Sequence, residues 1–131
     1  AALGVLSLVC VACAQVAIPD TPYGFYIGSA SAPVTVTQFG DLMCPQTKAS
    51  YPVMRQLAEH YGPEKLRFRF STFPLPYTHN SYFANQGAYV VEAGNSSSSA
   101  VWTWIETVFA NQGLFWNTIT ADQTPTQVIG K

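Results

Sequence analysis

The hydrophobic pattern in the first half of the chain predicts β-strands on either side of a helix. Residues 34–39 are rich in β-branched side chains, and Leu66, Phe68 and Phe70 alternate with two arginines. The alternation gives the second strand one face for a core and one face that meets water. Residues 23–27 could add a short edge strand. Strand, helix and strand in this order predict a right-handed βαβ unit with parallel strands.

The segment between these strands has apolar residues at helical spacing. The helix is expected to begin at Pro45, because proline fixes a helical φ and lacks an N–H that would find no partner there. We expect a kink at Pro52 and an end at Gly62. The residues of the expected apolar stripe recur about every four positions: Ala49, Val53, Leu57 and Tyr61, widened by Met54 and Ala58.

The second half of the chain has a helical pattern. Residues 81–93 are apolar nearly all round and predict a well-buried helix. Residues 100–111 predict another, with its apolar face formed by Val101, Ile105, Val108 and Phe109. Residues 124–127 have the Thr, Pro and Gln of a helix start, four residues before the end. We therefore expect the chain to be a fragment, truncated at both ends.

Composition fits one domain with a real core. The chain has 131 residues, of which 48% are hydrophobic and 14% aromatic. Four bulky aromatic residues are expected mainly in the core, although part of the set could line a peptide groove: Trp102, Trp104, Phe115 and Trp116. Only 10% of residues are charged and the net charge is −1, so no nucleic-acid partner is expected.

The first residues resemble a secretory signal peptide. Residues 1–18 carry no charge and include Ala12-Cys13-Ala14, a small-residue cleavage pattern. The favoured interpretation is a signal peptide over residues 1–14 and a mature domain over residues 15–131; a retained membrane anchor is the alternative. Cleavage would remove Cys10 and Cys13, leave Cys44 as the single thiol, and give no stable membrane insertion.

A secretory signal implies the endoplasmic reticulum or secretion from the cell. A lone cysteine in such an oxidising compartment pairs with another molecule, stays buried, or is reactive. Asn95-Ser96-Ser97 is an N-glycosylation sequon, which fits a secreted glycoprotein.

The candidate site is the turn that joins the first long strand to its helix. Cys44 stands directly ahead of Pro45, as the N-cap. A thiol there meets unpaired backbone N–H groups and the positive end of the helix dipole, which favour the nucleophilic thiolate. The alternative is a buried cysteine without chemistry. Thr47 could bond to the sulfur or simply be a polar residue of the first turn, and Asp41 could accept a proton or bond to the turn's backbone.

No cofactor or metal is expected. His79 is interpreted as a local capping or packing residue, and His60 suits the C-terminal end of its helix. Two histidines and one mature cysteine do not make a zinc site.

Three local features resemble the DsbA-like branch of the thioredoxin superfamily. They are the lead-in strand over residues 28–41, Cys44-Pro45-Gln46-Thr47 at the place of the redox motif, and Phe73-Pro74-Leu75-Pro76-Tyr77-Thr78-His79 before the helices. The resemblance implies an α/β thioredoxin-like fold, with a βαβ unit and a helical insertion over about residues 80–131. It also implies that the sheet's C-terminal strands and a cis-proline loop are missing.

The sequence departs from that family at one decisive position. The family's redox pair is Cys-x-x-Cys, whereas Thr47 stands at the second position here, so dithiol chemistry within the motif is excluded. Two functions follow. One is an oxidoreductase or isomerase-like protein that forms mixed disulfides through Cys44 with cysteine-containing polypeptides or a redox partner. The other is a non-catalytic, chaperone-like module that binds polypeptides.

Overall fold

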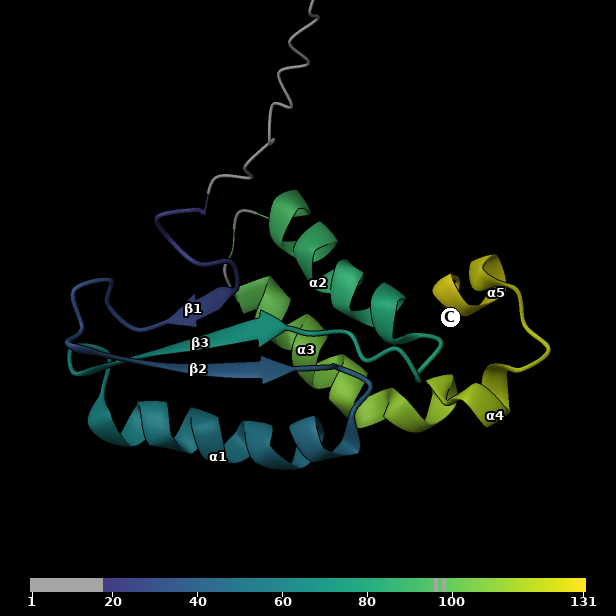
Figure 1. The fold of residues 1–131 in the computed structure, drawn as a ribbon, viewed down its shortest axis with the longest axis horizontal. Coiled ribbons are helices and arrows are strands. Elements are labelled where there is room, and N and C mark those ends of the chain that lie inside the picture. Colours follow the sequence, from purple (N-terminus) through teal and green to yellow (C-terminus); the bar gives the residue numbers. More distant parts are fainter. Residues whose placement is uncertain (1–17, 96, 98) are drawn as a thin grey trace, which may run out of the picture.

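The computed structural model describes residues 18–95, 97 and 99–131, which form a three-stranded sheet flanked by helices (Figure 1). The expected signal peptide and its cleavage after Ala14 lie outside these residues. The elements are, in chain order, β1 (Phe25–Ile27), β2 (Val34–Gly40), α1 (Pro45–Tyr61), β3 (Leu66–Thr72), α2 (Ser81–Gly94), α3 (Ser99–Asn111), the 3-10 helix η1 (Gln112–Phe115), α4 (Asn117–Thr120) and α5 (Pro125–Ile129).

The sheet has the order β1-β3-β2 and confirms the expected strand–helix–strand unit. β2 and β3 run parallel, with Val36 opposite Phe68, and α1 makes the connection between them. β1 pairs with β3 in the antiparallel direction and is the edge strand expected from residues 23–27. This mixed α/β arrangement places the turn after β2 directly before α1.

The core lies on one face of the sheet. Phe68 is fully buried and its ring lies 6.5 Å from Tyr51 of α1 and 6.1 Å from Trp102 of α3. Both helices therefore pack on the same face. The opposite face carries Arg67 and Arg69, which are only partly buried, as the alternating pattern of β3 predicts.

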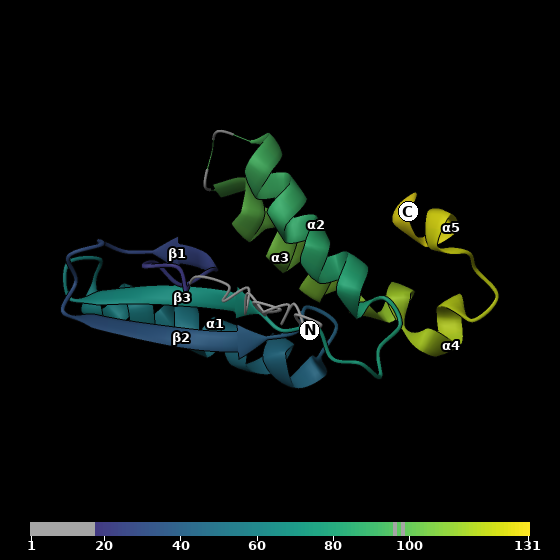
Figure 2. The ribbon, with the colours of Figure 1, turned by 45° about the horizontal axis from the view of Figure 1, so that its top comes forward.

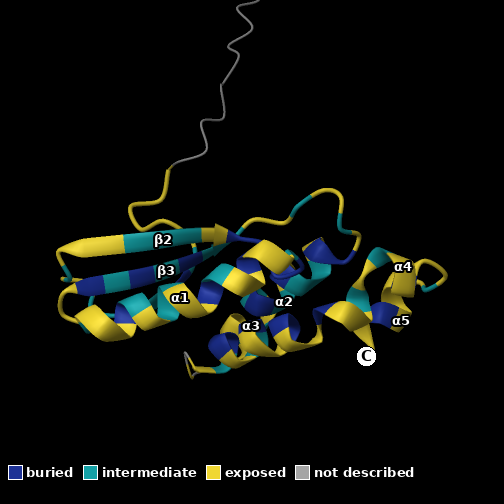
Figure 3. Cartoon of the chain, turned by 90° about the horizontal axis from the view of Figure 1, so that it is seen from below, coloured by how far each residue is buried: buried dark blue, intermediate teal, exposed yellow. Residues whose placement is uncertain are grey.

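The buried face of α1 matches the predicted stripe only in part, because Ala58 is buried and Met54 and Leu57 pack partly buried against the core. Val53 and Tyr61 are 58% and 51% exposed, and Ala49 is exposed too, whereas Thr47, Tyr51 and Ala58 are buried. A strict spacing of four drifts by about 40° per step around a helix of 3.6 residues per turn. The buried set instead follows spacings that keep one face, with Met54 packed against it. Figure 3 shows that exposed residues cover much of α1.

Pro52 lies within α1, which continues from Pro45 to Tyr61. The helix begins and ends as predicted, with Cys44 as N-cap and Gly62 as C-cap.

The prediction that α2 is buried nearly all round is wrong. Only Ser81, Asn85 and Ala88 are buried, while Tyr82 and Val90 are 60% and 63% exposed. Figures 1 and 2 show α2 lying beside α3 at the outside of the molecule. The rest of the protein therefore covers only one side of α2.

The apolar face predicted for α3 is confirmed, because all of its members are buried: Val101, Ile105, Val108 and Phe109. Of the four bulky aromatic residues, Trp102 is buried and Trp104 and Phe115 pack partly buried against the core. Trp116 is 48% exposed, so its placement in the core was wrong. The short helix η1 ends just before this residue, which leaves its ring outside the packed layer.

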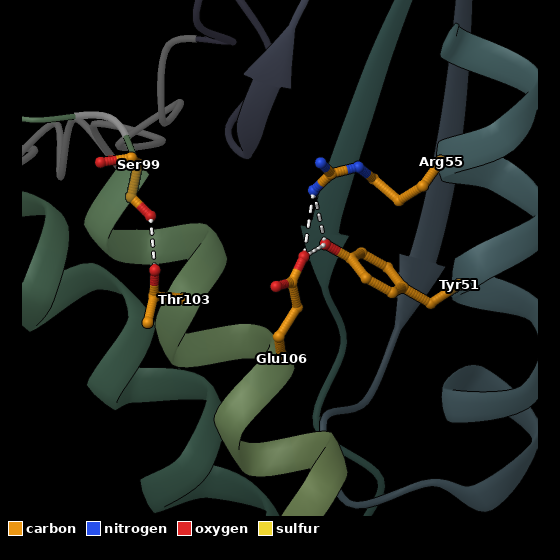
Figure 4. Close-up of polar contacts among 5 residues, drawn as sticks. All are labelled: Tyr51, Arg55, Ser99, Thr103 and Glu106. Atoms are coloured by element: carbon orange, nitrogen blue, oxygen red, sulfur yellow. Dashed lines mark hydrogen bonds and ion pairs between the residues drawn. The ribbon is translucent and has the colours of Figure 1, made fainter. Parts of the chain in front are cut away.

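A polar cluster formed by Tyr51, Arg55 and Glu106 links α1 to α3 (Figure 4). The Tyr51 hydroxyl donates to Glu106 Oε1 at 3.4 Å and accepts from Arg55 Nη1 at 3.0 Å. Arg55 also forms an ion pair with Glu106 at 3.4 Å. Burial of the phenol raises the pKa of Tyr51 to about 12, although the neighbouring Arg55 opposes that change.

The raised pKa of Tyr51 makes stability depend on alkaline pH. Below about pH 10 the phenol is protonated in both folded and unfolded chains, so its contribution is complete; between about pH 10 and 12 only the unfolded chain ionises, and stability is lost. We expect the wild-type free energy of unfolding to fall by about 2 to 3 kcal/mol more than that of Tyr51→Phe across this window. Denaturant titrations at several pH values measure the difference, and parallel curves would refute the assignment.

No helix in the described residues is both long enough and apolar enough to cross a membrane.

Candidate active site

Cys44 lies in the turn between the end of β2 and the start of α1. Its backbone is extended, with φ −85° and ψ 123°, and it is the N-cap of a 17-residue helix that has Pro45 in its first turn. The thiol is partly exposed and donates to Gln46 Oε1 at 3.1 Å. Among the described residues, the Cys44 side chain makes no capping hydrogen bond to the first turn of α1. The sulfur is therefore the side-chain group nearest in sequence to the unpaired N–H groups of the first turn.

Asp41 holds the backbone of the turn. It is 1% exposed, and its Oδ1 accepts from the Met43 N–H at 2.9 Å and from Asn85 Nδ2 at 2.8 Å. Its Oδ2 accepts from the Leu75 N–H at 3.2 Å. Both carboxylate oxygens are thus used by hydrogen bonds within the fold, which matches the backbone-bonding interpretation of Asp41 and not that of a proton acceptor for the thiol.

Two buried side-chain amides from the helical region, those of Gln112 and Asn85, hydrogen-bond to the backbone of this turn. Neither residue was predicted from the sequence. Gln112 Nε2 donates to the Leu42 carbonyl at 2.8 Å and to the Cys44 carbonyl at 3.2 Å. Asn85 Oδ1 accepts from the Leu42 N–H at 3.4 Å. Asn85 could have been found from the sequence, because it is a polar residue within the apolar pattern of α2 and a polar residue on a buried face needs a hydrogen-bond partner.

Thr47 lies one helical turn after Cys44 and is 9% exposed. The hydrogen bond found for the Cys44 thiol goes to Gln46, and none to Thr47 is formed among the described residues. The Thr47 methyl group instead packs beneath the end of β2, close to Gly40. Thr47 therefore acts here as a packing residue of the first turn.

Gly40 allows this packing because it has no side chain. A Cβ there would lie 2.5 Å from Thr47 Cγ2 and 3.0 Å from the Phe70 ring. We expect Gly40→Ala to lower the free energy of unfolding by about 1 to 3 kcal/mol through overpacking. Thermal or denaturant unfolding measures the change.

Gly94→Ala is the matched control for this prediction, because nothing lies within 4 Å of a Cβ at that position. It is expected to be neutral or slightly stabilising. Equal effects of the two substitutions would show that Gly40 is not a close contact.

The two histidines lie away from this chemistry. The backbone N–H of His79 donates to Asn117 Oδ1 at 2.9 Å, a contact between the segment before α2 and α4. His60 lies in the last turn of α1, with its ring 5.0 Å from that of Tyr61. In the part of the chain that the structure describes, no group of three His, Cys, Asp or Glu side chains is placed to hold a metal ion.

The site can now be compared with known proteins. A family model described as thioredoxin matches residues 20–128. The chain belongs to the thioredoxin family. No curated protein matches its sequence.

Solved structures share the fold of this chain. A "putative protein-disulfide isomerase" from Pseudomonas syringae aligns with TM-score 0.73 at 14% identity, over 82% of this chain and 62% of that one. Wolbachia pipientis alpha-DsbA1 T172V aligns with TM-score 0.63 at 20% identity, over 84% and 53%. Pseudomonas aeruginosa DsbA2 aligns with TM-score 0.59 at 20% identity, over 70% and 50%.

These likenesses confirm the DsbA-like fold, in which a thioredoxin βαβ unit is followed by helices. The chain spans 50% to 62% of the length of these three proteins.

Proposed function

We propose that this thioredoxin-family protein is a thiol–disulfide oxidoreductase or isomerase-like protein that acts through Cys44 alone. The observation that carries the proposal is the partly exposed thiol at the start of a 17-residue helix. A helix start favours negative charge on sulfur, and the thiolate is the species that attacks disulfides.

The reaction is an exchange with no net oxidation in its first step. The Cys44 thiolate attacks one sulfur of a substrate disulfide; a Cys44–substrate S–S bond forms, the original S–S bond breaks, and the other substrate sulfur leaves as a thiolate. Release requires a second thiolate to attack the mixed disulfide, either from the substrate or from an external thiol. Because Thr47 cannot supply that thiolate, the proposed partners are cysteine-containing polypeptides or a redox partner protein.

The neighbours of Cys44 have different proposed roles. Pro45 fixes the helix start, and Thr47 packs the first turn against β2. The exposed Gln46 accepts from the thiol, and rotation of its amide would present Nε2–H to a thiolate. Gln46 can thus contact both protonation states of the sulfur.

Capture of a small disulfide tests the proposal. The full chain is incubated with oxidised glutathione, and the Cys44-containing peptide is analysed by mass spectrometry. We expect a glutathione adduct at Cys44 that forms faster in the folded protein than in urea and is released by added thiol. Equal rates in the two states would contradict the proposal.

A second candidate function is a polypeptide-binding module without redox turnover. Two observations favour it: Thr47 replaces the second motif cysteine, and an apolar cavity of about 650 Å³ lies between α2, α3 and α5. Its lining includes Met43, Phe83, Val90, Trp104, Val108 and Val128. Such a module would bind an unfolded polypeptide equally well before and after alkylation of Cys44, whereas mixed-disulfide capture would be lost.

Restoring the second cysteine is expected to change the chemistry. Cα atoms three residues apart in a helical turn lie about 5 Å apart, which is within reach of a disulfide. We therefore expect Thr47→Cys to form an internal disulfide with Cys44 under mild oxidation, measured as the loss of both free thiols in the peptide that contains positions 44 and 47, because Cys10 and Cys13 also carry thiols. Ser50→Cys, further along α1, is the control and should leave Cys44 free. Retention of both thiols in Thr47→Cys would show that the turn is too distorted.

We also propose a secretory compartment, either the endoplasmic reticulum or the cell exterior. The apolar residues 1–18 with their small-residue cleavage pattern support this location. Asn95, the acceptor of the sequon, is exposed at the end of α2, which supports a glycoprotein.

A further inference from the structure

Gln112 belongs to the helical region but reaches the turn that presents Cys44. It opens η1 directly after α3 and is 3% exposed. Its Nε2 donates to the Leu42 carbonyl at 2.8 Å and to the Cys44 carbonyl at 3.2 Å, although 68 positions separate it from Cys44. One buried amide group therefore uses both of its donor hydrogens on the candidate site.

Other backbone groups hydrogen-bond to the N–H and the carbonyl of Cys44. The Cys44 N–H donates to the Asp41 carbonyl at 3.0 Å, and the Cys44 carbonyl also accepts the Lys48 N–H at 3.0 Å, which is the first hydrogen bond of α1. Gln112 thus holds the peptide group that joins the turn to the helix. The direction of this peptide sets the direction in which the Cys44 side chain leaves the backbone.

We infer that Gln112 is a positioning residue for Cys44, an inference that rests on the proposed reactivity of that thiol. Without the amide donors, the buried Leu42 carbonyl loses its side-chain partner and the turn shifts to find another one. The Cys44 side chain then leaves the backbone in a different direction relative to the start of α1. The helical insertion thereby sets the reactivity of the cysteine, through one side chain.

The test is the rate of Cys44 alkylation by iodoacetamide in Gln112→Met, followed at the Cys44-containing peptide. Methionine has a similar shape and flexibility but cannot donate. We expect a rate about tenfold lower than in the wild type, because small displacements of a reacting group have large effects. Gln123→Met is the matched control, since Gln123 Nε2 donates only to the Ile119 carbonyl of its own segment. Its rate should stay within about twofold of the wild type.

Gln112→Glu supplies a readout that a merely structural role would not move. A protonated carboxyl group can donate one hydrogen bond and a carboxylate cannot. The alkylation rate of Gln112→Glu relative to the wild type should therefore rise as the pH falls from about 8 to about 5. A side chain needed only for stability would change the melting temperature and leave this ratio flat.

The outcomes separate the two proposals. If the wild-type thiol reacts no faster in the folded than in the unfolded chain, the proposed function and the positioning role both fail. If the wild-type thiol is fast and Gln112→Met is equally fast, only the positioning role is overturned. If Gln112→Met does not fold, the pH dependence of Gln112→Glu decides: a rising ratio supports the role and a flat ratio overturns it.

Discussion

In Cys44→Ser, the peptide that contains position 44 is expected to carry no mixed disulfide after incubation with oxidised glutathione or with a disulfide-containing peptide, while Cys10 and Cys13 are read separately. The hydroxyl of serine remains protonated at neutral pH and does not exchange with disulfides, so the loss should be complete and not partial. Mass spectrometry of peptides after incubation, with the peptide that contains position 44 as the readout, measures it. In the same assay the wild-type chain should carry one adduct at this position.

Cys44→Ser should fold like the wild type, so a difference in adduct formation between the two chains reflects the missing thiol. Among the described residues the thiol hydrogen-bonds to Gln46, and a serine hydroxyl can replace this bond. Gln46→Ala is a comparison variant and not a neutral control: it removes that contact, and adduct formation should continue because Cys44 is still present. Adducts that form on the folded chain at the same rate with and without Cys44 would show that the chemistry lies elsewhere.

Tyr51→Ala is expected to lower the free energy of unfolding by about 3 to 5 kcal/mol, the range for truncating a large buried aromatic residue. The Tyr51 ring packs 5.9 Å from Phe70 and 5.2 Å from Phe109, so it joins the sheet to α3. Truncation leaves a cavity between these layers and removes a partner of Arg55 and Glu106. Urea unfolding followed by circular dichroism measures the loss.

Val53→Ala is the matched control on the same helix, because Val53 is 58% exposed. Its effect should stay within about 0.5 kcal/mol. If Val53→Ala had the larger effect, the face with Val53, and not the face with Tyr51, would be the buried one. The pair therefore tests the orientation of α1 directly.

The sequence predicted the elements of this fold better than their faces. β-branched residues, the alternation in β3 and the proline and glycine at the ends of α1 each have a local physical cause, so their positions could be read without tertiary information. The buried face of α1 could not, because Tyr51 competes with Val53 and Tyr61 for burial. Which side wins depends on Phe68, Phe70 and the later helix α3, which are remote in the sequence.

The residues of the candidate site likewise include some that the sequence predicted and some that it did not. Cys44 and Pro45 were predicted from their local order, since an N-cap followed by proline is a property of neighbouring residues. Asn85 and Gln112 were missed because they act across 43 and 68 positions, and nothing near them in the sequence indicates their partners. A polar residue inside an apolar helical pattern is the signal that would have singled out Asn85.

The most direct measurement is the alkylation rate of Cys44 as a function of pH, in the folded chain and in the same chain unfolded by urea, read at the Cys44-containing peptide. The unfolded chain is the reference, because it has the same sequence around the sulfur without the helix. If the start of α1 makes the thiol nucleophilic, the folded rate at mildly acidic pH should exceed the unfolded rate by about tenfold or more. A folded rate equal to or below the unfolded rate would contradict a reactive cysteine and leave a thioredoxin-fold binding module.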